Sequence, residues 1–183
     1  TYGNVSSTSS LVIAHIIISL AILSVLFVVI FFTNKRAFTT RKQFLFILTL
    51  YLLAFALASL IGSDSQTLKY VVPFSVLAIY LSLFFKRSFV FAVYTVMLIP
   101  ILFIVESGAE IFFMNLCGGI VSIVSFRYFN RGWMQFLNSF IAFVAMLTIH
   151  IAMALMTEDS NIYIVVEQSF AIAFNSLLIV ACY

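Results

Sequence analysis

The chain alternates long apolar runs with short polar gaps. Seven of these runs have the length and composition of membrane-spanning helices, which need about 20 mostly apolar residues. They cover residues 11–33, 43–62, 70–85, 89–105, 111–126, 134–156 and 162–183. The runs are continuously apolar rather than alternating in polarity, so they favour helices over strands. The pattern therefore predicts an all-α, polytopic bundle of seven transmembrane helices.

The gaps between the runs are short, and none has room for a soluble domain. Short connections make consecutive helices antiparallel neighbours in a bundle. We therefore expect one transmembrane domain over residues 1–183. The chain begins at Thr1 rather than at Met and stops at Tyr183 within an apolar run. Both features lead us to expect that the domain is excised from a longer protein.

Basic residues occupy alternate gaps, and Lys69 is the single exception among nine. The others are Lys35, Arg36, Arg41, Lys42, Lys86, Arg87, Arg127 and Arg131. The intervening gaps carry acidic residues: Asp64, Glu106, Glu110, Glu158 and Asp159. Cytoplasmic loops of membrane proteins are enriched in Lys and Arg. The basic residues therefore act as topology anchors, and they predict an N-terminus outside and a C-terminus in the cytoplasm.

The composition supports a lipid bilayer as the partner of this chain. It is 64% hydrophobic and 8% charged, whereas soluble domains carry about 25% charged residues. The net charge of +3 therefore indicates topology and contacts with anionic lipid heads rather than nucleic-acid binding. Cys117 and Cys182 lie inside apolar runs, so no disulfide framework is expected.

The sequence offers little material for catalysis. His15 and His150 are its only histidines, and neither has a second metal ligand three or four residues away. A metal site is therefore not expected, and an interhelical hydrogen bond or an interfacial position is the favoured role of each histidine. No Ser-His-Asp set, paired Cys ligands or Gly-rich phosphate loop is present in the sequence. We predict no catalytic residue, no metal ligand and no cofactor within the chain, which is not an enzyme by itself.

The seventh run is the most polar and contains Glu167, Gln168 and Asn175. A carboxylate inside a membrane span is a functional candidate by default. Near a helix end it can also line a polar crevice at the outer leaflet, and this interpretation is favoured for Glu167. Gln168 and Asn175 are two helical turns apart and share a face. We expect Gln168 and Asn175 to form a polar stripe toward the bundle interior, and we treat the three residues together as a candidate signalling or polar face.

Gly118 and Ser122 in the fifth run are small residues at a spacing of four. Such pairs let two helix backbones approach closely in a membrane. Helix packing is the favoured role, with a hinge or a binding surface as the alternative. Pro73 and Pro100 lie near predicted outer helix ends, where they could shape a cavity or simply end a helix.

Several short motifs occur in a characteristic order. They are Tyr70-Val71-Val72-Pro73, Lys86-Arg87-Ser88, Gly118-Gly119-Ile120-Val121 before Arg127, a span with Asn138, and Phe174-Asn175-Ser176. Together they resemble the membrane domain of the bacterial seven-transmembrane HD-domain phosphohydrolases, over nearly the whole chain.

The resemblance implies that an extracytoplasmic sensor domain precedes the bundle and that a cytosolic HD domain follows it in the same polypeptide. In that family the HD domain is similar to phosphodiesterases of cyclic-di-AMP that use divalent metals held by His and Asp. His15 and His150 are each followed by Ile, so the metal ligands would lie outside this chain. The expected function is a signalling or anchoring domain in the bacterial cytoplasmic membrane.

Other functions stay open at this point. The substrate-binding membrane subunit of a vitamin transporter is a bundle of similar length, but it usually has six spans. Its first helix should carry small residues at four-residue spacing, whereas here Ala14 is followed by Ile18. An envelope scaffold and a small channel are further alternatives. The sequence leaves the ligand and the oligomeric state, including a homo-oligomer, undecided.

Overall fold

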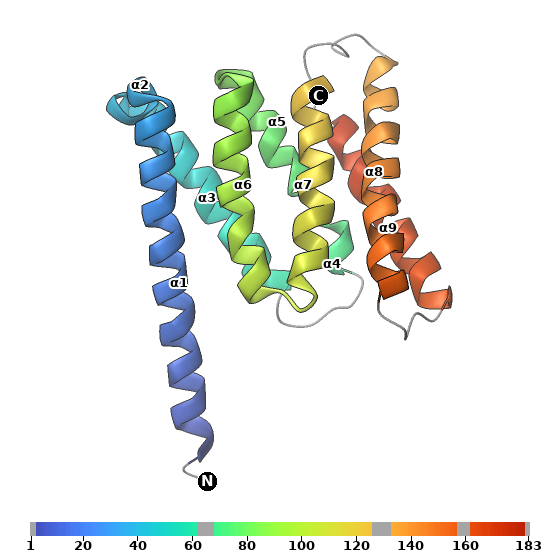
Figure 1. Cartoon of the computed structure of the whole chain (residues 1–183), viewed down its shortest axis with the longest axis horizontal. Coiled ribbons are helices and arrows are strands. Elements are labelled where there is room, and N and C mark those ends of the chain that lie inside the picture. Colours follow the sequence, from blue (N-terminus) through green and yellow to red (C-terminus); the bar gives the residue numbers. More distant parts are fainter. Residues whose placement is uncertain (1–2, 62–67, 126–132, 157–161, 182–183) are drawn as a thin grey trace.

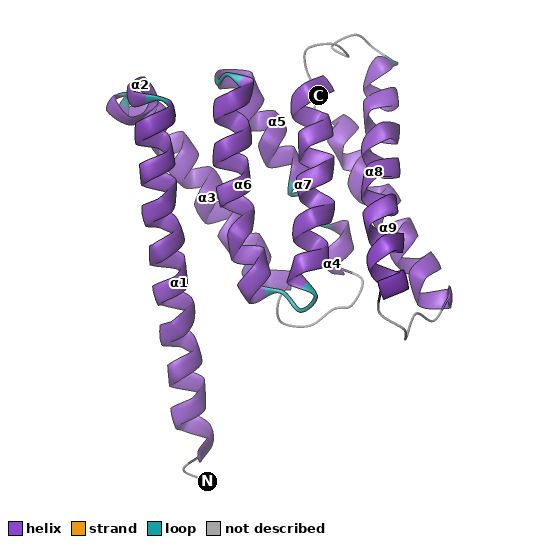
Figure 2. Cartoon of the chain, in the orientation of Figure 1, coloured by secondary structure: helices purple, strands orange, loops and turns teal. Residues whose placement is uncertain are grey.

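The computed structural model describes residues 3–61, 68–125, 133–156 and 162–181, and these ranges are almost entirely helical (Figure 2). Nine helices and no strand occur in them: α1 (Gly3–Thr33), α2 (Lys35–Thr39), α3 (Arg41–Ile61), α4 (Leu68–Val71), α5 (Ser75–Phe84), α6 (Arg87–Ile104), α7 (Gly108–Ser125), α8 (Met134–Met156) and α9 (Ile162–Ala181). The predicted all-α class is confirmed.

Five of the described helices are long and apolar enough to cross a membrane. They are the Ile16–Thr33 part of α1 together with α3, α6, α7 and α8. Two shorter apolar stretches, Leu68–Phe84 and Tyr163–Ile179, lie where the third and seventh spans were predicted, so the count of seven crossings stays a prediction. Helix α8 coincides with the predicted run, and α3, α6 and α7 begin and end within three residues of theirs.

Two predicted runs need correction. Helix α1 begins at Gly3 instead of residue 11, and the third run is broken into α4 and α5. The break lies at Val72–Phe74 and is explained by Pro73, which has no backbone N–H and disfavours the helical conformation of the preceding residue. Helix α5 is therefore only 10 residues long.

The helices form two layers (Figure 1). Helices α1, α6, α7 and α8 lie side by side in one layer, and α3, α5 and α9 cover them from behind. Consecutive helices from α5 to α9 pack on one another, as short connections predict. Helix α1 instead packs mainly on α6. Helix α2 lies between α1 and α3 in the chain. The hydroxyl of Tyr51 in α3 donates to the carbonyl of Ser19 in α1 at 3.1 Å and links these two helices.

Charged side chains distinguish the two ends of the bundle, and Figure 1 shows which helices and turns form each end. The basic end holds α2 and the α5–α6 turn, with exposed Lys35, Lys42 and Lys86. The acidic end holds α4 and the α6–α7 turn, with Glu106 and Glu110. The first turns of α1 extend beyond the acidic end.

The centre of α7 is packed closely on both sides. A Cβ atom on Gly119 would lie 2.2 Å from the ring of Tyr94 in α6, and one on Gly118 would lie 2.0 Å from the terminal methyl of Met146 in α8. Small residues allow this approach between helices. The buried Tyr94 hydroxyl donates to the Asn115 carbonyl at 2.7 Å, which fixes its ring against α7. Helix α7 is thus the central element of the bundle.

Candidate functional site

Three helices bring one polar side chain each to a common point at the acidic end. His150 of α8 places its Nδ1 atom 2.6 Å from Oε1 of Glu110 in α7. The hydroxyl of Tyr70 in α4 donates to the same oxygen at 3.1 Å. The rings of Tyr70 and His150 meet edge to face, with centroids 5.1 Å apart. We call Tyr70, Glu110 and His150 the acidic-end cluster.

The cluster is largely buried and contains two ionisable side chains. The side chains of His150 and Glu110 expose only 2% and 14% of their surface. When Glu110 is a carboxylate, which can only accept, His150 Nδ1 is the donor of this hydrogen bond. Glu110 lies in the first turn of α7, where the helix dipole and free N–H groups favour a negative charge. The interhelical hydrogen bond expected for His150 is therefore present.

The second ring nitrogen of His150 is the unusual feature of the cluster. Nε2 is buried and has no hydrogen-bond partner among the described residues. A buried polar atom left without a partner costs about 1–3 kcal/mol, so each such atom calls for an explanation such as a bound water or ion. His150 is thus the member of the cluster that has a ring nitrogen available for a further hydrogen bond.

Lys69 lies beside the cluster, and its surroundings account for its exceptional position in the charge pattern. Its side chain is largely buried, with 9% exposure. Nζ makes a long hydrogen bond of 3.5 Å to Ser107 Oγ and lies 5.5 Å from the ring centroid of Tyr70. Ser107 occupies the α6–α7 turn with a left-handed φ of 59°. Lys69 therefore contacts the acidic end of the bundle rather than marking a basic loop.

Asn175 connects α9 to this region. Its side chain is fully buried, and Nδ2 donates to the carbonyls of Tyr70 and Val72 at 3.0 Å each. These carbonyls lie at the end of α4, where Pro73 prevents a further helical turn, and helix ends leave such acceptors unsatisfied. Asn175 thus binds the backbone that carries Tyr70.

The other two members of the predicted signalling face lie elsewhere. Gln168 is half-buried, whereas Glu167 is exposed. Eight residues rotate a helix position by about 80° beyond full turns, so Glu167 and Asn175 do not point the same way. Asn175 faces the interior and Glu167 is exposed, and the outer-leaflet crevice expected for Glu167 stays a prediction.

The structure also places the predicted packing residues and topology anchors. Gly118 and Ser122 are both buried, and the Ser122 hydroxyl donates to the Gly118 carbonyl at 2.9 Å. Of the anchors, Lys35, Arg41, Lys42 and Lys86 are exposed and Arg87 is half-buried. Arg127 and Arg131 lie outside the described residues, as do the side chains of Arg36 and His15.

A second buried polar group joins α7, α8 and α9 toward the basic end. The Ser125 hydroxyl bonds to Asn138 Oδ1, and the Ser139 hydroxyl donates to the Ser176 carbonyl. All four side chains are buried. We call Ser125, Asn138, Ser139 and Ser176 the basic-end seam. It contains no ionisable side chain, so it provides hydrogen bonds without charge.

The described ranges contain no group of three His, Cys, Asp or Glu side chains arranged to hold a metal ion. The acidic-end cluster supplies two such residues and a tyrosine hydroxyl. It can hold a proton or bind a small polar group, but it has no activated nucleophile. In the sequence Glu110 is recognisable only as a loop charge, and no motif there links it to His150. The available signal was that both lie near the same predicted membrane face.

Over residues 10–182 the sequence matches the family described as the 7TM receptor with intracellular HD hydrolase. The chain belongs to this family. It is a multi-pass membrane protein, and its family associates this membrane domain with an intracellular HD hydrolase. No curated protein and no solved structure matches the chain.

Proposed function

We propose that this bundle is the transmembrane coupler of a receptor that controls an HD phosphodiesterase acting on a cyclic dinucleotide. In this proposal the chain crosses a bacterial cytoplasmic membrane seven times, with the acidic end outside and the basic end in the cytoplasm. The separation of charge between the two ends supports this orientation. Hydrolysis, and the divalent metals it needs, would belong to the HD domain outside this chain.

One observation carries the coupling mechanism. Asn175 ties α9 to the two carbonyls at the end of α4, and Tyr70 of α4 is bonded to Glu110 in the acidic-end cluster. A change at the cluster would therefore reach α9 through two sets of hydrogen bonds. Helix α9 is the last helix of the chain and the proposed output element. A signal can act only through different affinities for two states of the bundle, and the spare His150 Nε2 is where such a difference can arise.

The orientation can be tested by labelling single cysteines in a cysteine-free background. Thr39→Cys reports the basic end and Glu106→Cys the acidic end, because both residues are exposed. An impermeant maleimide added to intact cells should label only Glu106→Cys, and Thr39→Cys should react after the membrane is opened. Labelling of Thr39→Cys in intact cells would contradict the proposed orientation.

The coupling is tested in the full-length protein with Asn175→Leu, which removes both hydrogen bonds to α4. The measured quantity is the rate of cyclic-di-AMP hydrolysis with and without the sensor domain expected before Thr1. In the parent protein the two rates should differ, and in Asn175→Leu the difference should shrink several-fold. The exposed neighbour Phe174 provides the control Phe174→Leu, which should keep the parental difference. An unchanged difference in Asn175→Leu would reduce the bundle to a membrane anchor.

A further inference from the structure

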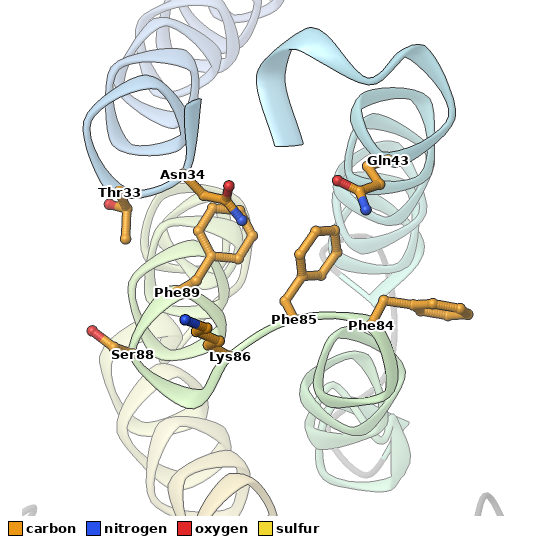
Figure 3. Close-up of a pocket in the computed structure, with 8 residues that line it drawn as sticks. All are labelled: Thr33, Asn34, Gln43, Phe84, Phe85, Lys86, Ser88 and Phe89. Atoms are coloured by element: carbon orange, nitrogen blue, oxygen red, sulfur yellow. The ribbon is translucent and has the colours of Figure 1, made fainter. Parts of the chain in front are cut away.

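A cleft of about 460 Å³ opens at the basic end, between the α1–α6 pair and the α3–α5 pair (Figure 3). Its volume is within the range of about 300–1,000 Å³ that small-molecule sites occupy. The lining residues are Thr33, Asn34, Gln43, Phe84, Phe85, Lys86, Ser88 and Phe89. The cleft lies far from the acidic-end cluster and shares no residue with it.

The polar side of the cleft is suited to an anion. Lys86 supplies a positive charge, and the amide side chains of Asn34 and Gln43 face each other across the opening (Figure 3). Asn34 Oδ1 accepts from the Ala37 N–H at 3.2 Å, which leaves its NH₂ group as the donor toward the cleft. None of the lining residues is acidic. The first turn of α6 also has no acidic residue and no side-chain cap, so its dipole adds to the positive potential.

The other side of the cleft continues into an apolar crevice. This crevice, of about 230 Å³, is lined by Lys42, Gln43, Phe46, Phe84 and Phe85. The rings of Phe46 and Phe84 meet edge to face with centroids 5.0 Å apart. Phe84 exposes 63% of its surface. The cleft and the crevice share Gln43, Phe84 and Phe85, and each is bordered by one lysine, so together they suit an occupant with an anionic group and an apolar part.

We propose that this cavity binds one anionic phospholipid. The phosphate would lie between Lys86, Lys42 and the two amides, and an acyl chain would follow the Phe46–Phe84 surface toward the bilayer centre. A small soluble anion would leave the aromatic crevice uncovered. A zwitterionic lipid would gain little from the two lysines, because its own ammonium group cancels the charge of its phosphate. The position at the end of a membrane bundle supplies lipid of this kind at high local concentration.

The test uses fluorescence quenching by brominated lipids. The protein has one tryptophan, so Trp133→Phe removes the background and Leu83→Trp introduces a probe. Leu83 is exposed and adjoins Phe84 without lining the cavity. The chain is reconstituted with phosphatidylglycerol or phosphatidylcholine, each brominated on its acyl chains. Quenching should give an association constant several-fold higher for phosphatidylglycerol.

Lys86→Gln should lower that preference about five-fold, since one lysine near an anionic surface contributes about 1 kcal/mol. Lys42→Gln should lower the preference for phosphatidylglycerol similarly. Because Lys42 lies outside the α6 turn, this variant still tests the proposal if Lys86→Gln misfolds. Lys35→Gln is the matched control, because Lys35 is exposed at the same end but does not line the cavity. It should keep the preference.

Three results would overturn the proposal. Equal quenching by the two lipids would show that no selective lipid site exists. An equal loss in Lys35→Gln and Lys86→Gln would show only general surface charge. Complete competition by millimolar glycerol phosphate would identify a site for a soluble phosphate instead of a lipid.

Discussion

The acidic-end cluster and the basic-end seam hold the same helices together with different chemistry. At the acidic end, α7 and α8 meet through Glu110 and His150, a buried pair that can carry charge. At the basic end they meet through Ser125 and Asn138, which are neutral. Both contacts extend to α9, through Asn175 and α4 in one case and through Ser139 and Ser176 in the other.

The difference indicates which end can respond to a signal. Neutral interhelical hydrogen bonds in membranes contribute about 0.6 kcal/mol on average, and their strength does not depend on protonation in the physiological range. Breaking a buried ion pair by removing one partner costs about 3–5 kcal/mol. A ligand that binds at the acidic end can thus alter a larger contribution to stability than any in the neutral basic-end seam. We expect α7 and α8 to be joined firmly at one end and switchable at the other.

Glu110→Leu should produce the largest effect, because it leaves His150 and Tyr70 without their common acceptor. We expect a loss of about 3–5 kcal/mol in the free energy of unfolding, measured by denaturation of the purified protein in mixed micelles. The double variant Glu110→Leu/His150→Leu should recover more than half of this loss, because no buried charge remains. Glu106→Leu, at an exposed position of the same end, is the control and should change stability by about 0.5 kcal/mol or less. Additive losses in the double variant would show that the two residues do not act as a pair.

The middle of α7 lies between the two ends, and substitutions there test close packing rather than interhelical hydrogen bonds. Gly119→Ala should cost about 1–3 kcal/mol by overpacking, because the added methyl meets the Tyr94 ring, which its bond to the Asn115 carbonyl holds in place. Gly118→Ala should cost less, because it meets the flexible end of Met146. The same unfolding measurement compares the two variants. A larger loss in Gly118→Ala would mean that the α7–α8 contact, rather than the α6–α7 contact, is the rigid one.

Ser139→Ala in the basic-end seam should have the smallest effect. Loss of its bond to the Ser176 carbonyl should reduce stability by about 0.6 kcal/mol. Ser169→Ala is the matched control, since the Ser169 hydroxyl donates to the Val165 carbonyl of its own helix. This variant should leave the free energy of unfolding nearly unchanged. A loss in Ser139→Ala as large as that in Glu110→Leu would remove the distinction between the two ends.

Much of the fold follows from local sequence. The apolar runs predicted α3, α6, α7 and α8 closely, because a helix in a membrane must satisfy its own backbone and be apolar over a defined length. The break between α4 and α5 was missed, although Pro73 supplied the signal for it. In a continuous apolar run, a proline can kink a helix or end it. Here the end of α4 is stabilised by Asn175, which lies more than 100 residues away.

The candidate site followed from the sequence only in part. Asn175 and His150 were selected as polar residues within spans, and an interhelical hydrogen bond was the favoured role for His150. The hydrogen-bond partners of His150 were not identified, because Glu110 lies 40 residues before His150 in the sequence and Tyr70 lies 40 residues before Glu110. Counting along a helix gives the depth of a residue in the membrane. It does not give the rotation of that helix about its axis, and for this reason Glu167 was grouped with Asn175 although Glu167 is exposed and Asn175 is buried.

The sequence by itself determined the helical class, the membrane location, the charge difference between the ends and the family. These properties depend on composition and on spacing along one segment, where the physical constraint is local. Only the tertiary structure decided that α1 packs on α6, that Lys69 is buried beside Tyr70, and that Glu110 meets His150. Such contacts depend on how side chains of separate helices fit together, since in lipid the partner of each helix is selected by close packing and by interhelical hydrogen bonds.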